Sequence, residues 1–524
     1  MPVETRFRSI TPTKRNNLVP LWLHILIGIF AINTIVVIVM ENRRPTDTLA
    51  WVLLLLFVPV FGLVLYFLVG TRPGKHTLIQ QTDLQQLKSY IAPASVAPTP
   101  AEEPLASLLL TNNGALLTDN NQLQLYTTFK AMIEQLMRDI ANAKHHIHFQ
   151  FFKFEDDAIG RQISDLLIQK ASAGVEVRVI YDAAANWSVP ASFYRRLRKG
   201  GVEVEPFNKI FPYLSSFSNY RNHRKVVVID AQIGYMGGMN IAERYLTGIR
   251  TGIWRDTHFR ITGSAVAELQ IAFVSDWHFA THRLLNSPHY FRDLKEEKNA
   301  TDFPPSSLAE SYTVETPLIK QSPAEENNPY TDIPTPTNTT QGVKVQIVTS
   351  NPTDPWRVMN QALPLLISQA QRYVWLQSPY FIPTDAILNA ICTMALAGKD
   401  VRLMIPAKSD RGILVPKATF SYLDRILSAG VKVYLYDAGY MHAKTVVVDD
   451  RIASIGSVNI DPRSISLSFE INAFIYDTRI ASQQRRLFEQ DIQSAHLLNL
   501  TTWRQRSFLQ RSAESFARIL APMF

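Results

Sequence analysis

Two short stretches of this chain, HRKVVVID at 223–230 and HAKTVVVD at 442–449, share the pattern H-x-K-x4-D. Each is followed by a second motif, GGMN at 237–240 and GSVN at 456–459. The first glycine stands at the same distance from the histidine in both copies, since 237 − 223 = 14 and 456 − 442 = 14. One such pattern is weak evidence, but two copies at equal spacing indicate an internal duplication.

The sequence around the two motifs repeats in the same order. A glycine ends a predicted helix at Gly174 and again at Gly398. Their offset, 398 − 174 = 224, is close to the 442 − 223 = 219 that separates the histidines, so only loop lengths differ. Predicted strands alternate with predicted helices in both copies, which favours α/β domains. We therefore expect a duplicated α/β/α sandwich, with one domain at 118–285 and the other at 343–524.

Two proline-rich stretches separate these blocks. The first, at 76–117, holds four prolines among alanine, serine, threonine and glutamate. This composition predicts a flexible tether, because it offers too little apolar surface to order the chain. The second, at 286–342, has eight prolines in 57 residues, which predicts an interdomain linker.

The amino terminus predicts insertion into a membrane. Residues 18–40 contain no Lys, Arg, Asp or Glu and are long enough to cross about 30 Å of hydrocarbon. A second apolar run follows at 48–70, which argues against a cleaved signal peptide. We expect two transmembrane helices in an anchor at 1–75. Basic residues before and between them favour both termini, and the catalytic domains, on the cytoplasmic side of a cell membrane. These residues are Arg6, Arg8, Lys14, Arg15, Arg43 and Arg44.

Charge and cysteine content narrow the possible partners. The net charge of +8 predicts an anionic partner, either nucleic acid or an anionic membrane surface. The apolar runs favour the membrane, and we expect no nucleic-acid partner. Cys392 is the single cysteine, which excludes an intrachain disulfide and a cysteine-based zinc site.

The histidine and lysine of each motif suit the chemistry of phosphoryl transfer. Alternate residues of a strand face the same way, so these two side chains project together. Two motifs paired about a pseudo-dyad bring two imidazoles and two ammonium groups around one phosphate. One imidazole can attack phosphorus and the other can protonate the departing alkoxide, while the lysines hold the non-bridging oxygens. Asn240 and Asn459 can add hydrogen bonds, and the chemistry requires no metal or cofactor.

The carboxylates need separate interpretations. Asp230 and Asp449 stand seven residues after their histidines, so strand parity points them away from the imidazoles and predicts a structural role. A nucleophilic histidine still benefits from a carboxylate on its other ring nitrogen. Asp256 and Glu470 lie at similar distances past the two motifs and are the candidates. The sequence does not say which carboxylate serves which histidine.

Two groups of side chains in residues 145–154 could be interpreted as functional sites. Three histidines, His145, His146 and His148, could form a metal cluster, but their position between a helix and a strand favours a solvated edge. The aromatic residues that follow could stack on bases, but core packing of a strand is the simpler prediction. They are Phe149, Phe151, Phe152 and Phe154.

The paired motifs resemble the two signature motifs of the phospholipase D superfamily, and the surrounding sequence resembles the bacterial cardiolipin synthases. The stretches that carry the second resemblance are NRRPT at 42–46, NYRNHRK at 219–225, WRDTH at 254–258, SPYFIP at 378–383, DPRS at 461–464 and FEINAF at 469–474. The match covers nearly all of the chain outside the two proline-rich stretches.

The resemblance implies a phosphatidyltransferase, which moves a phosphatidyl group from one phosphatidylglycerol to another and releases glycerol. It implies His223 as the nucleophile and His442 as the general acid. The full catalytic set that it implies is His223, Lys225, Asp230, His442, Lys444 and Asp449. The implied partners are phosphatidylglycerol and other anionic phospholipids of a membrane.

Three other functions remain open at this point. A phospholipase D or phosphodiesterase would use the same motifs with water in place of the lipid acceptor. A membrane-tethered nuclease of the same superfamily is disfavoured by the two apolar runs. A non-catalytic scaffold is disfavoured because no motif position is missing.

Overall fold

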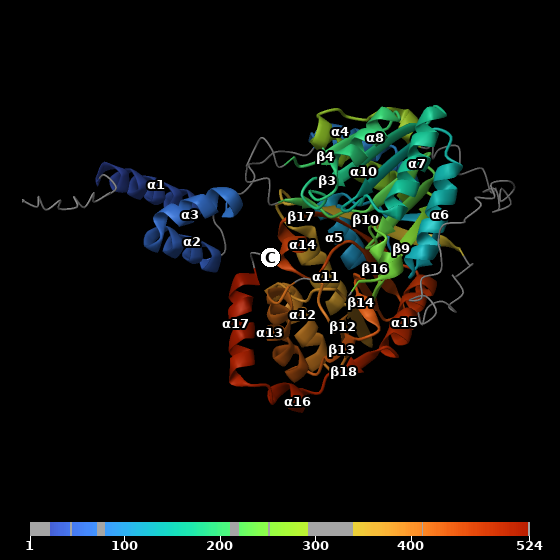
Figure 1. Cartoon of the computed structure of the whole chain (residues 1–524). Helices are drawn as coiled ribbons and strands as arrows, with labels where there is room; N and C mark the ends of the chain where they lie inside the picture. The colour runs from blue at the N-terminus through green and yellow to red at the C-terminus, as the bar shows by residue number, and fades with distance from the viewer. Residues whose placement is uncertain are drawn as a thin grey trace, which may run out of the picture. The chain divides into compact units, whose positions relative to one another are not determined.

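The computed structural model describes residues 21–41, 45–70, 79–209, 220–249, 252–291, 339–410 and 412–521. These residues fall into two compact units, an N-terminal unit at 21–70 and a main body at 79–521 (Figure 1). Most of the predicted linker at 286–342 lies outside the described residues, as do the basic residues from which the membrane orientation was predicted. Those basic residues are Arg6, Arg8, Lys14, Arg15, Arg43 and Arg44.

The N-terminal unit consists of apolar helices. Its helices are α1 (Leu21–Met40), α2 (Pro45–Phe57), α3 (Pro59–Leu65) and the π-helical turn η1 (Tyr66–Gly70). Among the described residues, α1 is the one helix long and apolar enough to cross a membrane. The second predicted span, at 48–70, is interrupted at Val58, because Pro59 has no N–H to donate and begins a new helix there. The structure thus has one such helix where the sequence predicted two.

Most strands of the main body form one continuous sheet of 16 strands. The strands of its first half are β1 (Thr118–Tyr126), β2 (His146–Phe151), β3 (Glu176–Asp182), β4 (Glu203–Phe207), β5 (Arg221–Asn222), β6 (Val226–Ile229), β7 (Ile233–Gly237), β8 (Ile253–Arg255) and β9 (His258–Thr262). Those of the second half are β10 (Thr340–Ser350), β11 (Tyr373–Gln377), β12 (Asp400–Pro406), β13 (Lys432–Tyr436), β14 (Gly439–Met441), β15 (Thr445–Val448), β16 (Ile452–Gly456), β17 (Ser468–Ile475) and β18 (Ala495–Leu497). β8 and β14 stand outside the main sheet and pair with each other.

The pairing of the strands confirms the duplication. The sheet order is β18-β13-β12-β11-β15-β16-β17-β10 through the second half and β1-β9-β7-β6-β2-β3-β4 through the first. In the first half β2, β3 and β4 are parallel neighbours, and β6, which holds the apolar run of the motif, pairs antiparallel with β2. In the second half β11, β12 and β13 are parallel neighbours, and β15 pairs antiparallel with β11 in the same way. The halves meet where β1 and β10 pair antiparallel, so the two sandwiches share one sheet.

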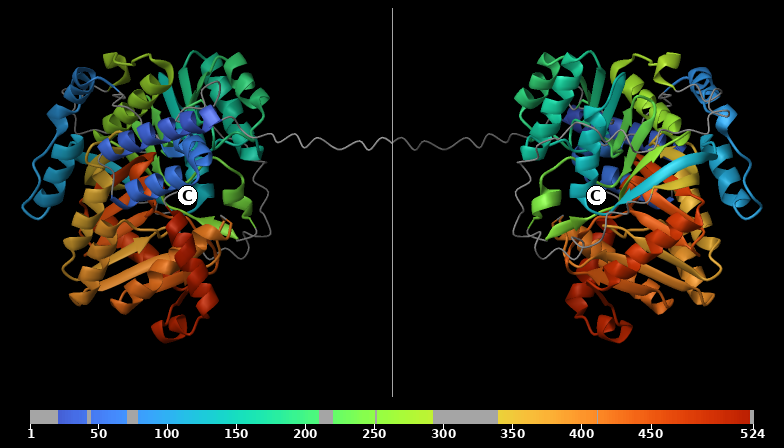
Figure 2. Two further views of the ribbon diagram at one scale, coloured as in Figure 1. Left: turned by 90° about the vertical axis from the view of Figure 1, so that its left-hand side faces the viewer. Right: turned by 90° about the vertical axis from the view of Figure 1, so that its right-hand side faces the viewer.

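Helices pack on both faces of this sheet (Figures 1 and 2). They are α4 (Gln81–Ser89), α5 (Glu103–Asn113), α6 (Phe129–Ala141), α7 (Ala158–Ser172), α8 (Ala191–Lys199), α9 (Arg244–Thr247), α10 (Ala265–Thr281), α11 (Val358–Ser368), α12 (Asp385–Leu396), α13 (Leu414–Ser428), α14 (Pro462–Ser466), α15 (Thr478–Ile492), α16 (Leu500–Arg504) and α17 (Phe508–Leu520), with short 3₁₀ turns at Ala92–Ala94 and Pro288–Tyr290. The apolar run of each motif is buried on both faces of the sheet. In the first motif Val227 packs with α6 and α7, while its neighbour Val228 packs with α10. A strand buried on both faces fixes the residues that precede it.

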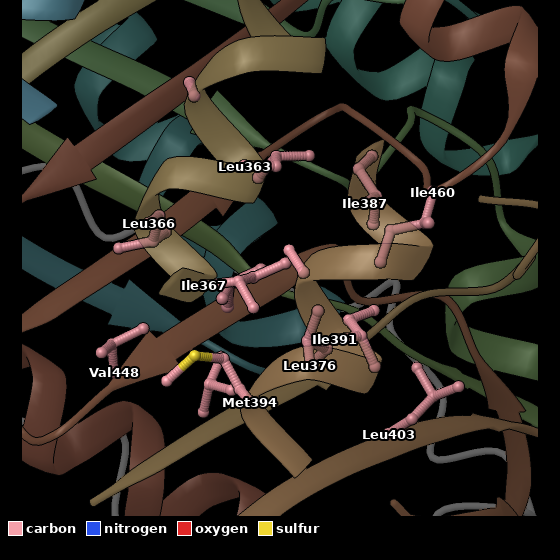
Figure 3. Close-up of a cluster of buried hydrophobic side chains, with 14 of the residues drawn as sticks. Leu363, Leu366, Ile367, Leu376, Ile387, Ile391, Met394, Leu403, Val448 and Ile460 are labelled. Atoms are coloured by element: carbon pink, nitrogen blue, oxygen red, sulfur yellow. The ribbon is translucent and has the colours of Figure 1, made fainter. Parts of the chain in front are cut away.

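The largest core cluster lies between the second half of the sheet and the helices α11 and α12. Figure 3 shows its side chains interdigitating between these helices and the strands. The labelled residues are Leu363, Leu366, Ile367, Leu376, Ile387, Ile391, Met394, Leu403, Val448 and Ile460.

The predicted tether at 76–117 is wrong for the residues that the structure describes. α4 and α5 are helices, and Leu87 is buried against α10 while Leu105 and Leu109 are buried against α11. Pro104 stands in the first turn of α5, where proline starts a helix instead of breaking one. The leucines four residues apart then share one face, and this local pattern outweighs the average composition.

The predicted solvated edge at 145–148 is also wrong for two of its three histidines. His145 is exposed, but His146 and His148 are fully buried on β2, because α10 covers this face of the sheet. His148 stacks on Phe273, with 4.4 Å between ring centroids, and its Nδ1 lies 3.1 Å from Gln270 Oε1. Burial lowers the pKa of His146 to about 4.

Candidate active site

The histidine that begins each motif is hydrogen-bonded through its backbone N–H to the other half of the main body. The backbone N–H of His223 donates to the carbonyl of Phe469 at 2.9 Å, and that of His442 donates to the carbonyl of Arg255 at 2.7 Å. Short parallel pairings extend these contacts, β5 with β17 and β14 with β8. The two histidines are therefore positioned by the interface between the halves.

His223 is bound by the carboxylate of Glu470, which the second half contributes. Its Nδ1 lies 3.0 Å from Oε2 and 3.1 Å from Oε1 of Glu470, and 3.1 Å from the carbonyl of Ser457. The Ser457 hydroxyl donates to Glu470 Oε2 at 2.5 Å and holds that carboxylate in place. Since these oxygens only accept, Nδ1 carries the proton and Nε2 keeps its lone pair.

His442 has the mirrored partner, Asp256 of the first half. Its Nδ1 lies 2.6 Å from Asp256 Oδ2, 2.9 Å from Lys444 Nζ and 3.3 Å from the Tyr245 hydroxyl. The pairing that the sequence left open is thus crossed, and each histidine takes its carboxylate from the opposite half.

Both histidines are neutral near neutral pH. Burial, together with the nearby lysines, lowers the pKa of His223 and of His442 to about 4, although the paired carboxylates act to raise it. For Asp256, burial acts to raise the pKa, but Lys444 and His442 outweigh it, and the net shift is downward. A neutral imidazole beside an ionised carboxylate is the form that a nucleophile needs.

The motif lysines lie beside their own histidines. Lys225 Nζ donates to the carbonyl of His223 at 2.5 Å, and Lys444 Nζ donates to the carbonyl of His442. Both side chains are buried, so desolvation lowers the pKa of Lys225 well below its usual value and that of Lys444 to about 8. Asp256 and Glu470 act in the opposite direction on both and help to keep them charged. The site thus holds two buried amino groups that can donate to an anionic oxygen.

The glycine motifs explain why the two carboxylates differ in length. A Cβ at Gly238 would lie 2.0 Å from Asp256 Oδ1, so the first half needs glycine there. Ser457 occupies the matching place in the second half, where its hydroxyl binds the longer Glu470. The N–H of each donates at 2.9 Å to the residue that follows its carboxylate, Thr257 or Ile471.

The two motif asparagines are buried and line the pocket in front of the histidines. Asn240 accepts from the N–H of Lys153 at 3.2 Å and donates to the Tyr245 hydroxyl at 3.2 Å. Asn459 Oδ1 has no hydrogen-bond partner among the described residues. A buried acceptor of this kind beside a pocket is available to a hydroxyl of a ligand.

The motif aspartates lie at the other end of their strands. Asp230 accepts from the N–H groups of Lys144, His145 and His146 at 2.8–3.0 Å. Asp449 accepts in the same way from the N–H groups of Gln371, Arg372 and Tyr373 at 2.6–2.9 Å. Each aspartate ties the turn after the motif strand to the start of the neighbouring strand. This arrangement matches the structural role that strand parity predicted.

The pocket has two lobes that meet at His223. Both lobes are lined by Phe152, His223, Tyr380 and Asn459. The first adds polar groups around the second histidine: Lys153, Asn240, Arg244, Tyr245, Asp410 and His442. The second adds two arginines, one aspartate, two serines and an apolar wall: Arg221, Arg463, Asp461, Ser464, Ser468, Ile382, Val415, Pro462 and Ala521. His223 therefore reaches both lobes.

Several residues that line the pocket lie outside the sequence motifs and were not predicted from them. Asp410 accepts from the hydroxyls of Tyr380, at 3.0 Å, and Tyr440, at 2.5 Å, and these contacts hold a carboxylate at the pocket. Tyr245 lies in the short helix α9 and Asp410 in the connection between β12 and α13, so both come from segments of the repeats outside the motifs. Phe152, predicted as core, instead lines the pocket, and its ring stands edge-to-face on His223 with 4.8 Å between centroids. Across the described ranges, no three His, Cys, Asp or Glu side chains are grouped as ligands for a metal ion.

Known proteins are similar to this chain over most of its length. A family model described as "Cardiolipin synthase, PLD-like domain" matches residues 136–277 and 363–492, and a phospholipase D–nuclease N-terminal model matches 29–70. The major cardiolipin synthase ClsA of Bacillus subtilis is 36% identical over 507 residues, which cover 93% of this chain and 96% of the relative. The cardiolipin synthase of Geobacillus kaustophilus is 34% identical, with 93% and 91% covered.

A solved structure shares the fold. The crystal structure of phosphatidylserine synthase from Haemophilus influenzae superposes with a TM-score of 0.56 at 18% identity and covers 81% of this chain and 99% of that one. Both repeats that hold the histidines fall within the matched family model, and the chain therefore belongs to the cardiolipin synthase family of phospholipase D-like proteins.

Proposed function

We propose that this protein is a cardiolipin synthase, which transfers a phosphatidyl group between two phosphatidylglycerol molecules through a phosphohistidine. The observation that carries the proposal is the crossed pair of histidine–carboxylate contacts, His223 with Glu470 and His442 with Asp256, around one pocket. Two neutral imidazoles with fixed tautomers and two adjacent ammonium groups fit the two ends of a phosphodiester. The catalytic set is His223, Lys225, His442 and Lys444, with Asn240 and Asn459 as substrate contacts and Asp256 and Glu470 as positioning residues.

In the first step, His223 Nε2 attacks phosphorus of the donor phosphatidylglycerol. The P–N bond forms as the P–O bond to the headgroup glycerol breaks, and His442 gives its Nε2 proton to the departing oxygen. Binding of the phosphate raises the pKa of His442 above its value of about 4, because an anion nearby favours the imidazolium. Lys225 and Lys444 stabilise the charge on the non-bridging oxygens.

In the second step, a headgroup hydroxyl of the second phosphatidylglycerol attacks the phosphatidyl-histidine. His442, now neutral, takes the hydroxyl proton, the P–N bond breaks, and the products are cardiolipin and free His223. Two substrate molecules are thus converted to one cardiolipin and one glycerol. The two lobes that meet at His223 support this sequence, because glycerol leaves and the acceptor hydroxyl enters beside His442 in the first lobe, while the second lobe is left for the rest of the phosphatidyl group on His223.

The assignment of His223 as the nucleophile rests on the same pocket. His223 lines both lobes, whereas His442 lines one of them. The intermediate must remain reachable by the incoming acceptor after glycerol leaves. His223 meets this condition because it lines both lobes. His442 lines the first lobe, where it can give a proton to the departing glycerol and take one from the acceptor hydroxyl.

We also propose the membrane arrangement and the domain plan. An anchor at 1–75 would cross the membrane twice, by α1 and by the divided helices α2 and α3, and leave the catalytic domains at 118–285 and 343–524 on the cytoplasmic side. The apolar length of α1 supports insertion. The substrates are anionic phospholipids of that membrane, and no nucleic acid is involved.

Product analysis tests this function. Purified full-length protein is given phosphatidylglycerol in detergent micelles, with a chelator present. We expect cardiolipin and glycerol in equal amounts, both lost in His223→Ala and His442→Ala. Phosphatidic acid as the main product would identify water as the acceptor and replace the transferase with a hydrolase. No turnover of phosphatidylglycerol would contradict the proposal as a whole.

A further inference from the structure

The last helix that the structure describes, α17, carries an apolar face that no described residue of the main body covers. α17 begins with a complete capping box between Ser507 and Gln510, so it is a well-formed helix of 13 residues. Four large apolar side chains on it are exposed to solvent. They are Phe508 (75% exposed), Leu509 (79%), Phe516 (61%) and Ile519 (73%).

These four side chains form one stripe along the helix. At 100° per residue they fall within an arc of about 100°, which also contains the exposed Ser512. The opposite side of α17 is the packed one, where Ala517 and Ala521 are buried against Ala418 of α13 and Ile382. The stripe is therefore not a core face left open by chance, because the helix already has its packing face on the other side.

Positive charge accompanies the stripe. Residues 500–521 contain four arginines and one glutamate, a net charge of 4 − 1 = +3. The glutamate, Glu514, is bound by Arg506 at 2.6 Å on the packed side. Arg511 and Arg518 are exposed on the flank of the stripe. An apolar stripe with arginines beside it is the pattern of a helix that lies in the surface of an anionic bilayer.

The carboxyl end of α17 lies at the pocket that His223 lines. Ala521, directly after α17, and Val415, at the start of α13, both line the second lobe of the pocket that His223 reaches. Two further apolar side chains beside Val415 are exposed, Ile413 and Leu414. Exposed apolar side chains therefore stand next in sequence to a residue of the pocket wall, at the start of α13. A lipid acyl chain that enters between the start of α13 and the end of α17 would pass these side chains while its headgroup lies at His223.

We propose that α17 docks on an anionic phospholipid bilayer, with its apolar stripe at the headgroup–acyl boundary, and that it places the mouth of the pocket on the membrane. This inference rests on the proposed function, because it takes the substrate to be a membrane lipid. The docking element acts in addition to the N-terminal anchor. It presents substrate to the second lobe without extraction of the lipid into water.

The first test compares substrate presentation in the full-length protein. Leu509→Asp combined with Phe516→Asp is expected to slow turnover of long-chain phosphatidylglycerol in reconstituted vesicles by about tenfold or more, because two apolar side chains no longer enter the interface. Turnover of short-chain phosphatidylglycerol in micelles should stay unchanged. The matched control is Leu396→Asp, a leucine 73% exposed at the end of α12. An unchanged rate in vesicles would overturn the proposal.

The second test reports the position of the helix and does not depend on activity. Cys392 is the single cysteine and is buried, so Phe516→Cys adds one accessible thiol for an environment-sensitive fluorophore. We expect quenching by spin-labelled lipid in vesicles for Phe516→Cys and none for Leu396→Cys. Protection from aqueous iodide without quenching by lipid would assign the stripe to a second copy of the chain and overturn lipid docking.

The two tests also separate this proposal from the proposed function. A wild-type protein that makes no cardiolipin in micelles would contradict the transferase, while lipid quenching at position 516 would still decide the docking. If the double variant were inactive in both vesicles and micelles, the quenching result alone would support or overturn the docking.

Discussion

The Nδ1 of His223 lies 3.0 Å from Oε2 of Glu470, a residue 247 positions further along the chain and in the other half of the main body. His442 and Asp256 repeat this contact in the reverse direction at 2.6 Å. Neither half therefore contains a complete histidine–carboxylate pair. Each copy supplies the carboxylate that contacts the histidine of the other copy, so in the proposed mechanism both copies are needed.

The crossed carboxylates give the first prediction. Glu470→Gln and Asp256→Asn should each lower kcat by roughly 10³- to 10⁴-fold with a small change in KM, because an amide no longer stabilises the imidazolium or fixes its tautomer. Steady-state kinetics with phosphatidylglycerol micelles measures both values. Asp437→Asn is the matched control, since Asp437 binds His496 at 2.5 Å on the surface. Equal losses in all three variants would contradict a positioning role.

Gly238, which packs against the carboxylate of Asp256, gives the second prediction. Gly238→Ser should abolish most activity, because its Cβ would overlap Asp256 Oδ1 and displace the carboxylate from His442. The reverse change in the other half, Ser457→Gly, removes one hydrogen bond to Glu470 and should cost only about tenfold. Activity assays and thermal unfolding of both variants check this asymmetry. Similar effects on activity in the two halves would rule out the steric explanation.

The motif aspartates give the third prediction. Asp230→Ala leaves three backbone N–H groups without their acceptor and should lower the free energy of unfolding by about 1–3 kcal/mol. The kcat of the protein that remains folded should change little. The free energy of unfolding of Asp230→Asn, which keeps one accepting oxygen, should lie between those of the wild-type protein and Asp230→Ala. A loss of kcat by several orders of magnitude at full thermal stability would instead show a catalytic role.

The pKa of Lys444 gives the fourth prediction. Burial lowers it to about 8, so kcat/KM should fall as pH rises through this value and the ammonium loses its proton. The Asp410 carboxylate acts to raise this pKa, and Asp410→Asn should therefore move the alkaline limb to lower pH. Asp424→Asn, on the surface of α13, is the control. An alkaline limb at the same pH in Asp410→Asn would contradict the assignment to Lys444.

Much of this site could be predicted from the sequence because its residues occur twice. The equal spacing of His, Lys, Gly and Asn showed the duplication, and strand parity predicted that Asp230 and Asp449 point away from the imidazoles. Asp256 and Glu470 could be proposed from their similar distances to the motifs. Their crossed pairing could not, because it depends on how the two halves meet.

The remaining differences have local physical causes. Average composition predicted a tether at 76–117, but leucines spaced four apart give α5 a buried face. His146 and His148 looked solvated because the covering helix α10 lies more than a hundred residues away in sequence. A hydropathy window does not register that Pro59 divides the second apolar run. Tyr245 and Asp410 reach the pocket from segments outside the repeated motifs.

The most direct test of the central claim is to identify the histidine that carries the phosphatidyl group. A p-nitrophenyl ester of phosphatidic acid supplies a leaving group that departs without protonation, so His442→Ala should still release a burst of nitrophenol and accumulate a covalent adduct. Mass spectrometry of peptides after an alkaline quench should locate this adduct on His223, and His223→Ala should give neither burst nor adduct. An adduct on His442, or a burst retained in His223→Ala, would contradict the mechanism.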